Sequence, residues 1–475
     1  MEAFNYLPNK KNLTILFLVS LIIKLIVFVG FIVQKERYKQ PDSMDYHHCA
    51  MALTSGRGMY RLDNNRPMFW RTPGYPLYLS WFYGFFGIKS LNFSDNNKAQ
   101  ITSIVVQIII NSLLTILIFF LAFTLTKSLA ISWVTAWIST FHPGFILTST
   151  YLLTEGLALF FIIPYFLFFY KSFGKNWIKN IVLAAIFLGI FTWIRPMGQF
   201  VSIASIMIIL ILDKTNWKTK FKKITLFFLL FLSLISGWYI RNYKITDRCF
   251  FCPMFGLYLN TFNAPKIIRE TTGITLRESI KQQYYKANKI AKQEYLIAKA
   301  KGKDLATELV HLKAALPVVL QHPFIFIKDW MKETAKTTFD LYSSQIVEFA
   351  KNTFHYDPPE EFLTEKIAEC LYKQKMSPLA RCIVYIELIF EILKWIGLLA
   401  GAFLFLIYPI FKKFNVSNDI KQTGLMWIKI SPIIAAFLVM TGGFGYARLR
   451  LPVESLMIIL SLTFWYWILK KNSIK

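Results

Sequence analysis

Long apolar runs are the feature that most limits what this chain can fold into. A transmembrane helix needs about 20 apolar residues, because each residue adds about 1.5 Å to a helix that crosses about 30 Å of hydrocarbon. With 55% hydrophobic residues, a soluble domain would expose large apolar patches. The sequence therefore predicts an all-α polytopic membrane protein. Apolar runs of suitable length occur at residues 13–34, 101–126, 128–148, 152–170, 224–240, 386–411, 423–443 and 452–469.

One further apolar stretch, residues 180–212, is long enough for one long helix or for two short helices. Pro196 removes a helical hydrogen bond and disfavours helix at Arg195, so we expect a break at this point. Dividing the stretch gives about ten transmembrane helices and places both lysine-bearing termini in the cytoplasm, as the positive-inside rule requires. The first run is followed by "QKERYKQ" rather than by a small-residue cleavage site, which predicts an uncleaved anchor.

The formal charge of +27 would suit a nucleic-acid-binding protein. The lysines, however, cluster just outside the apolar runs, for example within residues 214–223 and 470–475. That distribution is typical of cytoplasmic loops and of segments attracted to anionic lipid headgroups. We therefore expect membrane lipids, and no nucleic acid, as partners.

The apolar pattern divides the chain into three parts. Residues 1–240 are predicted to form a transmembrane module with a first external loop at 35–100, residues 241–385 an external (periplasmic) domain, and residues 386–475 the C-terminal transmembrane helices. The external domain lies between spans seven and eight, and the helical pattern in "LRESIKQQYYKANKIAKQEYLIAKAKG" predicts that it is mostly helical. In the first loop, "PGYPLYLSWFYGFFGI" (73–88) is too short to span, so we expect it to lie along the membrane surface.

Ionisable side chains near membrane depth are costly unless they are paired or face water, so they are candidates for function. The first external loop contains the cluster "QPDSMDYHHCA", in which Asp42, Asp45 and Tyr46 lie close together. We expect carboxylates and arginines from separate places in the sequence to meet in one cavity at the outer membrane boundary. The others, in this loop or at the same ends of predicted spans, are Arg71, Glu155, Arg195, Arg241, Arg448 and Arg450.

This combination of residue types predicts a particular chemistry. Arginine keeps its charge and binds phosphate through forked hydrogen bonds, and a carboxylate beside it can accept a proton from a hydroxyl nucleophile. The phosphate of a glycosyl phosphate leaves without needing a proton, so one base is enough, whereas a glycosidase needs two carboxyl groups. The pattern therefore indicates glycosyl transfer from a lipid-linked sugar phosphate to a hydroxyl or an amine.

Seven short motifs follow one another in an order known from a family of membrane enzymes. They are "PDSMDY", "RTPGYPLYL", "LTEGLALFF", "WIRP", "GWYIRNY", "QHPFIFI" and "RLRLPVESLMIIL". In this order they resemble the integral-membrane glycosyltransferases of the C-type superfold, and in particular the group of dolichyl-phosphate-mannose protein mannosyltransferases and lipid A aminoarabinose transferases. The resemblance covers the transmembrane module at both ends of the chain and leaves the external domain unassigned.

The resemblance implies an inverting hexosyl- or pentosyltransferase of the bacterial inner membrane that uses a polyprenyl-phosphate sugar as co-substrate. No cofactor is firmly implied, and a divalent cation is not expected. Asp42 falls on the position of the base and Glu155 on that of a second acidic residue. Asp45 is a candidate for a further carboxylate, because many relatives have Asp-Glu where this chain has Asp42-Ser43. The candidate substrate-binding residues are Arg71, Arg195, Arg241, Arg448, Arg450 and Tyr46. The sugar and the acceptor, which could be a lipid, a glycan or a protein, are not determined.

Each candidate also has a structural interpretation. Asp42 could cap the helix that follows it, Asp45 could simply face water, and arginines at helix ends are common interfacial anchors. Glu391 and Lys394 are spaced for an ion pair within one helix, and we assign no catalytic role to them.

Histidines and cysteines leave further alternatives open. His47 and His48 could bind a metal ion, although two adjacent histidines usually point apart. The cysteines at 249, 252, 370 and 382 would face an oxidising space, where they could form two disulfides of undetermined pairing or remain free thiols.

Two other functions fit parts of the pattern. A polysaccharide polymerase or O-antigen ligase also has a large external loop and essential arginines, but its key residues would lie mainly within that loop. A transporter or flippase for lipid-linked sugars would show paired halves and helices broken at the membrane midplane. No internal repeat is visible in this sequence and the charged groups lie at the membrane surface, so the glycosyltransferase hypothesis is preferred.

Overall fold

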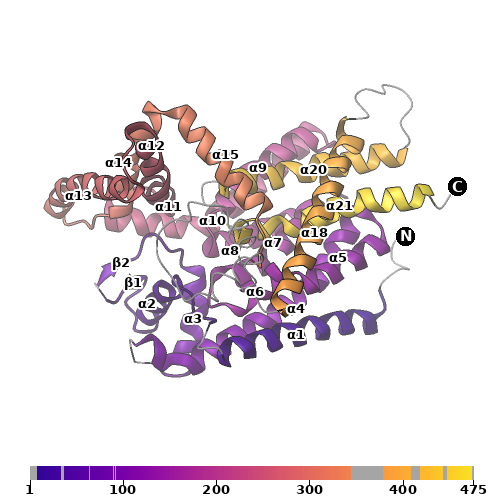
Figure 1. Cartoon of the computed structure of the whole chain (residues 1–475), viewed down its shortest axis with the longest axis horizontal. Helices are drawn as coiled ribbons and strands as arrows, with labels where there is room; N and C mark the ends of the chain where they lie inside the picture. Colours follow the sequence, from indigo (N-terminus) through magenta and orange to yellow (C-terminus); the bar gives the residue numbers. More distant parts are fainter. Residues whose placement is uncertain are drawn as a thin grey trace.

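A computed structural model describes residues 8–33, 37–63, 65–88, 90, 92–343, 378–407, 418–441 and 447–472. Within these residues the chain is almost entirely helical, and its one sheet is a short antiparallel hairpin of β1 (Tyr60–Arg61) and β2 (Arg66–Pro67). Most of the long helices run side by side along the long axis of the molecule (Figure 1). The predicted all-α fold class is confirmed.

Eight helices among the described residues are long and apolar enough to cross a membrane. The helices α14 (Thr307–Gln321) and α15 (Pro323–Phe339) meet at 109° and would add a ninth if they were counted as one span. The number is lower than the predicted ten because two apolar helices are short: α5 (Leu129–Phe141) has 13 residues and α9 (Gly198–Leu212) has 15. The eight are α1 (Lys10–Val33), α4 (Asn97–Thr126), α7 (Thr154–Lys171), α8 (Trp177–Ile194), α10 (Trp217–Thr246), α18 (Pro378–Ala402), α20 (Asn418–Thr441) and α21 (Leu451–Asn472).

Proline interrupts both apolar runs that contain a short helix. Arg195, which precedes Pro196, is extended with φ −136° and ψ 120°, so α8 ends one residue before it and the predicted break is present. His142, which precedes Pro143, is also extended, with φ −68° and ψ 123°. The run at 128–148 therefore divides into α5 and α6 (Pro143–Thr150), a second break that the sequence analysis did not predict.

The first helix shows how one side of a span faces lipid. Its buried residues are Leu16, Ser20, Lys24 and Phe28, at a spacing of four that places them on one face of α1. The ammonium group of Lys24 has hydrogen-bond partners on that face, since its Nζ donates to Ser20 Oγ at 2.6 Å and to the carbonyl of Asn111 at 3.0 Å. The other faces expose large apolar side chains, as expected for a helix at the edge of a membrane bundle.

The connections that carry the candidate residues gather at one end of the bundle, which we call the loop end. Helix α2 (Ser43–Thr54), the β1–β2 hairpin and α3 (Gly74–Phe85) lie there, and α2 packs against α3. The first turn of α1 and the last turn of α21 lie at the opposite end (Figure 1). Helix α3 exposes Trp81 and Phe85; its predicted position along the membrane surface stays a prediction.

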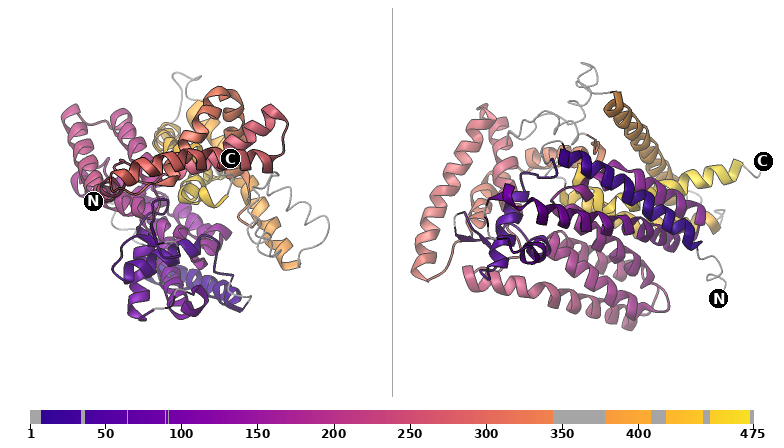
Figure 2. Two further views of the ribbon diagram at one scale, coloured as in Figure 1. Left: turned by 90° about the vertical axis from the view of Figure 1, so that its left-hand side faces the viewer. Right: turned by 90° about the horizontal axis from the view of Figure 1, so that it is seen from below.

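A helical insertion follows α10 and lies at the loop end (Figure 2). Its helices pack around a small apolar core of their own, formed by Leu259, Ala264, Ile267, Ala315 and Val319. Helix α13 begins with a capping box between Thr275 and Glu278. Residues 344–377 of the predicted external domain, which include Cys370, lie outside the described residues. Besides α14 and α15, the insertion consists of α11 (Met254–Tyr258), η3 (Leu259–Asn263), α12 (Ala264–Thr272) and α13 (Leu276–Ala300).

Candidate active site

Asp42 lies at the loop end, in the position before the first residue of α2. Its carboxylate makes no hydrogen bond to the start of the helix, so Asp42 is not a helix cap in the usual sense. Instead, Oδ1 accepts a hydrogen bond from Nη2 of Arg71 at 2.7 Å, and Oδ2 lies 3.7 Å from Nη2 of Arg448. The side chain is 31% exposed, so the carboxylate can be reached from outside the protein.

Asp45 lies one turn further along α2 and is held by three side chains of the same loop. Its carboxylate accepts hydrogen bonds from Arg71 Nε at 3.0 Å and from Trp70 Nε1 at 3.2 Å, and it lies 3.3 Å from Arg61 Nη1. Arg71 therefore joins Asp42 to Asp45, and its guanidinium also lies 5.1 Å from the centre of the Tyr46 ring. This arrangement makes Asp45 a partner that orients Arg71.

Glu155 lies in the first turn of α7 and is 5% exposed. Its Oε1 lies 3.5 Å from Arg195 Nη1, which comes from the break between α8 and α9, and 3.7 Å from Arg448 Nε. Arg448 therefore bridges Asp42 and Glu155. Carboxylates and arginines from separate parts of the sequence meet at the loop end, as the sequence analysis expected of them.

Polar residues of α4 hold the turn that precedes Glu155 in place through hydrogen bonds. The Gln107 amide donates hydrogen bonds to the carbonyls of Ser149 and Tyr151, each at 3.0 Å, and the Asn111 amide donates to the Gly156 carbonyl at 3.1 Å. A Cβ atom at Gly156 would lie 2.7 Å from Gln107 Nε2, so only glycine allows this close approach. Backbone that is not helical at this depth requires such internal partners.

The electrostatic environment keeps Asp42 ionised. Burial by itself would raise the pKa of the Asp42 carboxyl, but the positive charges of Arg71 and Arg448 outweigh burial and hold its pKa below the ordinary value. Burial raises the pKa of Tyr46 to about 12, so its hydroxyl keeps its proton at neutral pH. Of these two side chains beside Arg71, the Asp42 carboxylate is therefore able to accept a proton at neutral pH, and the Tyr46 hydroxyl is not.

Two predicted substrate-binding arginines lie away from these carboxylates. Arg241 donates hydrogen bonds to the carbonyls of Met59 and Met68, both at 2.9 Å, and so fastens the ends of the β1–β2 hairpin to α10. Arg450 is fully buried in a second ionic cluster. Among these described residues, neither arginine forms an ion pair with Asp42, Asp45 or Glu155, and their role in substrate binding stays a prediction.

The sequence analysis did not identify Arg61 and Trp70, which both contact Asp45. Both lie in the first external loop, and Arg61 is one of several charged residues in a polar stretch, so spacing alone offered no reason to select it. It also missed Gln107 and Asn111, although two amides in a predicted span were a signal that could have been used.

Potential metal ligands come together elsewhere. Among the described residues, one group of three lies close enough to share an ion: His142, Glu391 and Glu454, all buried. His142 Nδ1 accepts a hydrogen bond from the Gly144 N–H, which places the proton of the neutral ring on Nε2, the atom that faces Glu454. The carboxylates are already paired with cationic side chains, so this group is poorly suited to a metal ion.

Of the other potential ligands and thiols, His47 Nδ1 lies 3.0 Å from the Tyr83 hydroxyl, and the ring centres of His47 and His48 are 5.7 Å apart. Cys249 and Cys382 are free thiols, and Cys252 Sγ lies 3.4 Å from the Trp70 carbonyl.

The comparisons with known proteins concern part of the sequence and the overall fold. Residues 74–245 match the family model described as dolichyl-phosphate-mannose-protein mannosyltransferase. The archaeal oligosaccharyltransferase AglB from Archaeoglobus fulgidus, solved with an inhibitory peptide and a dolichol-phosphate, has a similar structure with a TM-score of 0.52 at 10% identity. The alignment covers 97% of this chain and 50% of the archaeal chain. The chain therefore shares its fold with the archaeal oligosaccharyltransferase over the aligned part.

A second solved structure gives a lower score. ArnT from Cupriavidus metallidurans, solved with undecaprenyl phosphate, gives a TM-score of 0.37 at 12% identity, over 94% of this chain and 78% of ArnT. No curated protein matches the sequence. The chain spans about half the length of the archaeal oligosaccharyltransferase, and the family match includes Glu155 and Arg195 but begins after Asp42 and Arg71.

Proposed function

We propose that this protein transfers a glycosyl group, with inversion, from a polyprenyl-phosphate-linked donor to a hydroxyl or amine of a lipid, glycan or protein acceptor. The observation that supports this most strongly is the position of Arg448, which lies 3.7 Å from both Asp42 and Glu155. A guanidinium beside an exposed carboxylate at one end of a membrane bundle can hold a phosphate next to a base. The archaeal structure with dolichol-phosphate supports a lipid-linked donor.

In the proposed reaction Asp42 is the base. The acceptor oxygen or nitrogen attacks the anomeric carbon, the bond between that carbon and the phosphate oxygen breaks, and the phosphate leaves with the electron pair. The proton of the acceptor passes to Asp42, which is ionised at neutral pH because its pKa is lowered. The leaving phosphate needs no proton, so the absence of a second exposed carboxylic acid beside Asp42 among the described residues is no obstacle.

Two arginines of the site are suited to bind a phosphate. The connected network includes four arginines, namely Arg61, Arg71, Arg195 and Arg448, and four carboxylates, namely Asp42, Asp45, Asp63 and Glu155, so its charges balance when all are ionised. An anionic donor would therefore bind by replacing a carboxylate contact of one or two of these arginines. We assign the phosphate to Arg195 and Arg448, whose contacts with Glu155 of 3.5 and 3.7 Å are longer than the contact of 2.7 Å between Arg71 and Asp42.

The same proposal gives the protein an orientation. With the loop end outside, the lysine-rich ends of α1 and α21 face the cytoplasm of a bacterial inner membrane, as the positive-inside rule favours. The lipid donor would then enter sideways from the outer leaflet, and the insertion would lie in the periplasm beside the acceptor. The donor sugar, a hexose or a pentose, is not specified by the residues described.

The test uses purified protein in lipid vesicles with synthetic polyprenyl-phosphate sugars and an acceptor extract on one side. We expect free polyprenyl phosphate to be released only when the acceptor is present, and only when the acceptor is on the side of the membrane that the loop end faces. Asp42→Asn should lower the rate about 100-fold or more, since it removes the base. Glu270→Gln, an exposed carboxylate of the insertion paired with Lys328, is the matched control and should leave the rate unchanged.

Two results would count against the proposal. Full activity of Asp42→Asn would show that another group acts as the base. No release by the parent protein with any polyprenyl-phosphate sugar would contradict the proposed reaction itself.

A further inference from the structure

A second ionic cluster lies beside the candidate active site and is completely buried. We propose that this buried cluster, formed by Glu391, Lys394, Arg450 and Glu454, positions Arg448 against Asp42 and Glu155 and ties that position to α15. The inference rests on the proposed phosphate-binding function of Arg448. It assigns positioning residues and no new chemical step.

Arg450 is the centre of the buried cluster and has no exposed surface. Its Nε donates a hydrogen bond to Glu454 Oε2 and its Nη2 donates to Glu391 Oε1, both at 2.8 Å. Its Nη1 donates to carbonyls at the end of α15, at 2.6 Å to Thr338 and 3.2 Å to Thr337. A positive charge at the carbonyl end of a helix is favourable, so Arg450 fastens the last turn of α15 to the beginning of α21.

Lys394 and Glu387 complete the connections around Arg450. Lys394 Nζ donates to Glu391 Oε1 at 2.7 Å and also to Glu454, so the predicted ion pair within α18 exists but is part of a larger network. The Tyr342 hydroxyl donates to Glu454 Oε2 at 3.0 Å. Glu387 accepts the backbone N–H of Tyr342 at 2.6 Å. The segment after α15 is therefore bound to both α18 and α21.

Arg448 is connected to this network through one short turn. The helix η6 (Ala447–Leu449) precedes α21, and the Arg450 N–H donates to the Ala447 carbonyl at 3.0 Å. Arg448 and Arg450 are two residues apart and reach different carboxylates, Asp42 and Glu155 in the first case and Glu391 and Glu454 in the second. Fixing Arg450 thus fixes the backbone from which Arg448 extends.

The other wall of the site contacts the same elements. A Cβ atom at Gly144 would lie 2.8 Å from both Leu451 and the Tyr342 ring, so the start of α6 is pressed against the start of α21. Helix α6 leads directly into the turn before Glu155. Both partners of the contact between Arg448 and Glu155 are therefore anchored to elements that the buried cluster holds together.

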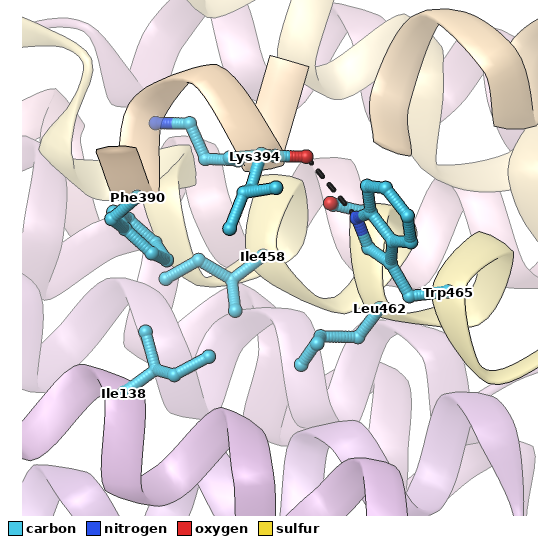
Figure 3. Close-up of a pocket in the computed structure, with 8 residues that line it drawn as sticks. Ile138, Phe390, Lys394, Ile458, Leu462 and Trp465 are labelled. Carbon is cyan, nitrogen blue, oxygen red and sulfur yellow. Dashed lines mark hydrogen bonds between the residues drawn. The ribbon is translucent and has the colours of Figure 1, made fainter. Parts of the chain in front are cut away.

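The buried cluster is closed to water and to substrate. Lys394 is 2% exposed, and the cavity beside it, of about 240 Å³, is lined by the apolar side chains shown in Figure 3. In that view the ammonium group of Lys394 points away from Ile458 and Leu462. Charged hydrogen bonds in such surroundings are little screened and hold their geometry firmly. Because the charged groups of the cluster have little exposed surface, we expect them to act on the reaction through the elements that they hold, and above all through Arg448.

The experiment measures binding of undecaprenyl phosphate to the full-length protein in nanodiscs. Glu391→Gln removes one charge from the buried cluster with little change of volume, and we expect about tenfold weaker binding, a typical size for the loss of one positioned charged contact. The matched control is Asp213→Asn, because Asp213 and Lys223 form another buried pair, at 2.6 Å. Lys223 lies 18 residues before Arg241 on α10, about 27 Å along the helix. The control should lose stability but keep the parent affinity.

A double-mutant cycle separates positioning from a general loss of structure. In an Arg448→Ala background, Glu391→Gln should have almost no further effect on binding, although it should still lower the melting temperature. Tyr342→Phe, which removes one hydrogen bond to Glu454 and no charge, should weaken binding in the same direction by a smaller factor and serves if Glu391→Gln does not fold.

The outcomes are distinct. Parent affinity in both Glu391→Gln and Tyr342→Phe, or a Glu391→Gln effect that adds in full to Arg448→Ala, would overturn the inference. Failure of the parent protein to bind undecaprenyl phosphate would instead count against the proposed function.

Discussion

Two ionic clusters at the loop end of this protein use the same residue types in different ways. At the candidate active site, Asp42 and Arg448 are 31% and 28% exposed and their closest contact is 3.7 Å. In the buried cluster, Arg450 and Glu454 have no exposed surface and are joined at 2.8 Å. The comparison teaches that exposure and loose contacts mark the charges that can exchange partners with a ligand, whereas enclosed charges with short contacts hold the framework.

The energetic reason is the surroundings of each cluster. A charge removed from water costs several kcal/mol, by order of magnitude, unless its partners replace the lost solvation completely. The buried cluster meets that condition through carboxylates, backbone carbonyls and a tyrosine hydroxyl. At the candidate active site the contacts of Arg448 are longer, at 3.7 Å, and its guanidinium is partly solvated, so these contacts are weaker and can be replaced by a phosphate oxygen at small cost.

The largest effect on stability is expected from Lys394→Met. This change removes a buried cation and leaves Glu391 and Glu454 with less compensation, which should lower the free energy of unfolding by about 3–5 kcal/mol. Denaturant titration of the purified protein in detergent micelles measures the change. An unchanged titration midpoint would show that the buried cluster does not hold the framework and would remove the contrast between the two clusters.

A smaller effect on stability is expected from Arg448→Ala. Its guanidinium is 28% exposed and its ion pairs with Asp42 and Glu155 are 3.7 Å long, so we expect a loss of less than about 1 kcal/mol. The same variant should bind undecaprenyl phosphate about tenfold more weakly or worse, because it loses a charged contact to the phosphate. If Arg448→Ala unfolds as readily as Lys394→Met while it binds the lipid normally, the assignment of the two clusters is reversed.

The smallest effect is expected in the pH dependence of transfer. Arg71 and Arg448 hold the pKa of Asp42 below its ordinary value, so the parent should keep its activity down to a pH below that value. Arg71→Gln removes one of these charges, and the acidic limb of the profile should then move to higher pH. For stability the sign is the same, since the contribution of ionised Asp42 is complete above its unfolded pKa and is lost as the pH falls through the folded pKa. An unchanged acidic limb would show that the ionisation of Asp42 does not control the rate of transfer.

Some features of the fold follow from local sequence. The apolar runs predicted every long helix that could span, since the length of a run is a local property that a helix converts directly into distance. The break at Arg195–Pro196 was predictable because proline acts on its own neighbours. The break at His142–Pro143 obeys the same rule, and it was missed because the surrounding run is apolar as a whole and long enough for one span.

The sequence by itself also determined which residues deserved attention at the candidate site. The cost of charge near lipid singled out Asp42, Glu155, Arg195 and Arg448, and the structure brings all four together. Only the tertiary structure decided their partners. Arg448 and Arg450 look equivalent in "RLRLP", yet one reaches the candidate active site and the other the buried cluster. The physical reason is that the direction of a side chain and its ion pairs depend on helices that are distant in sequence, whereas the cost of its charge depends on its local surroundings.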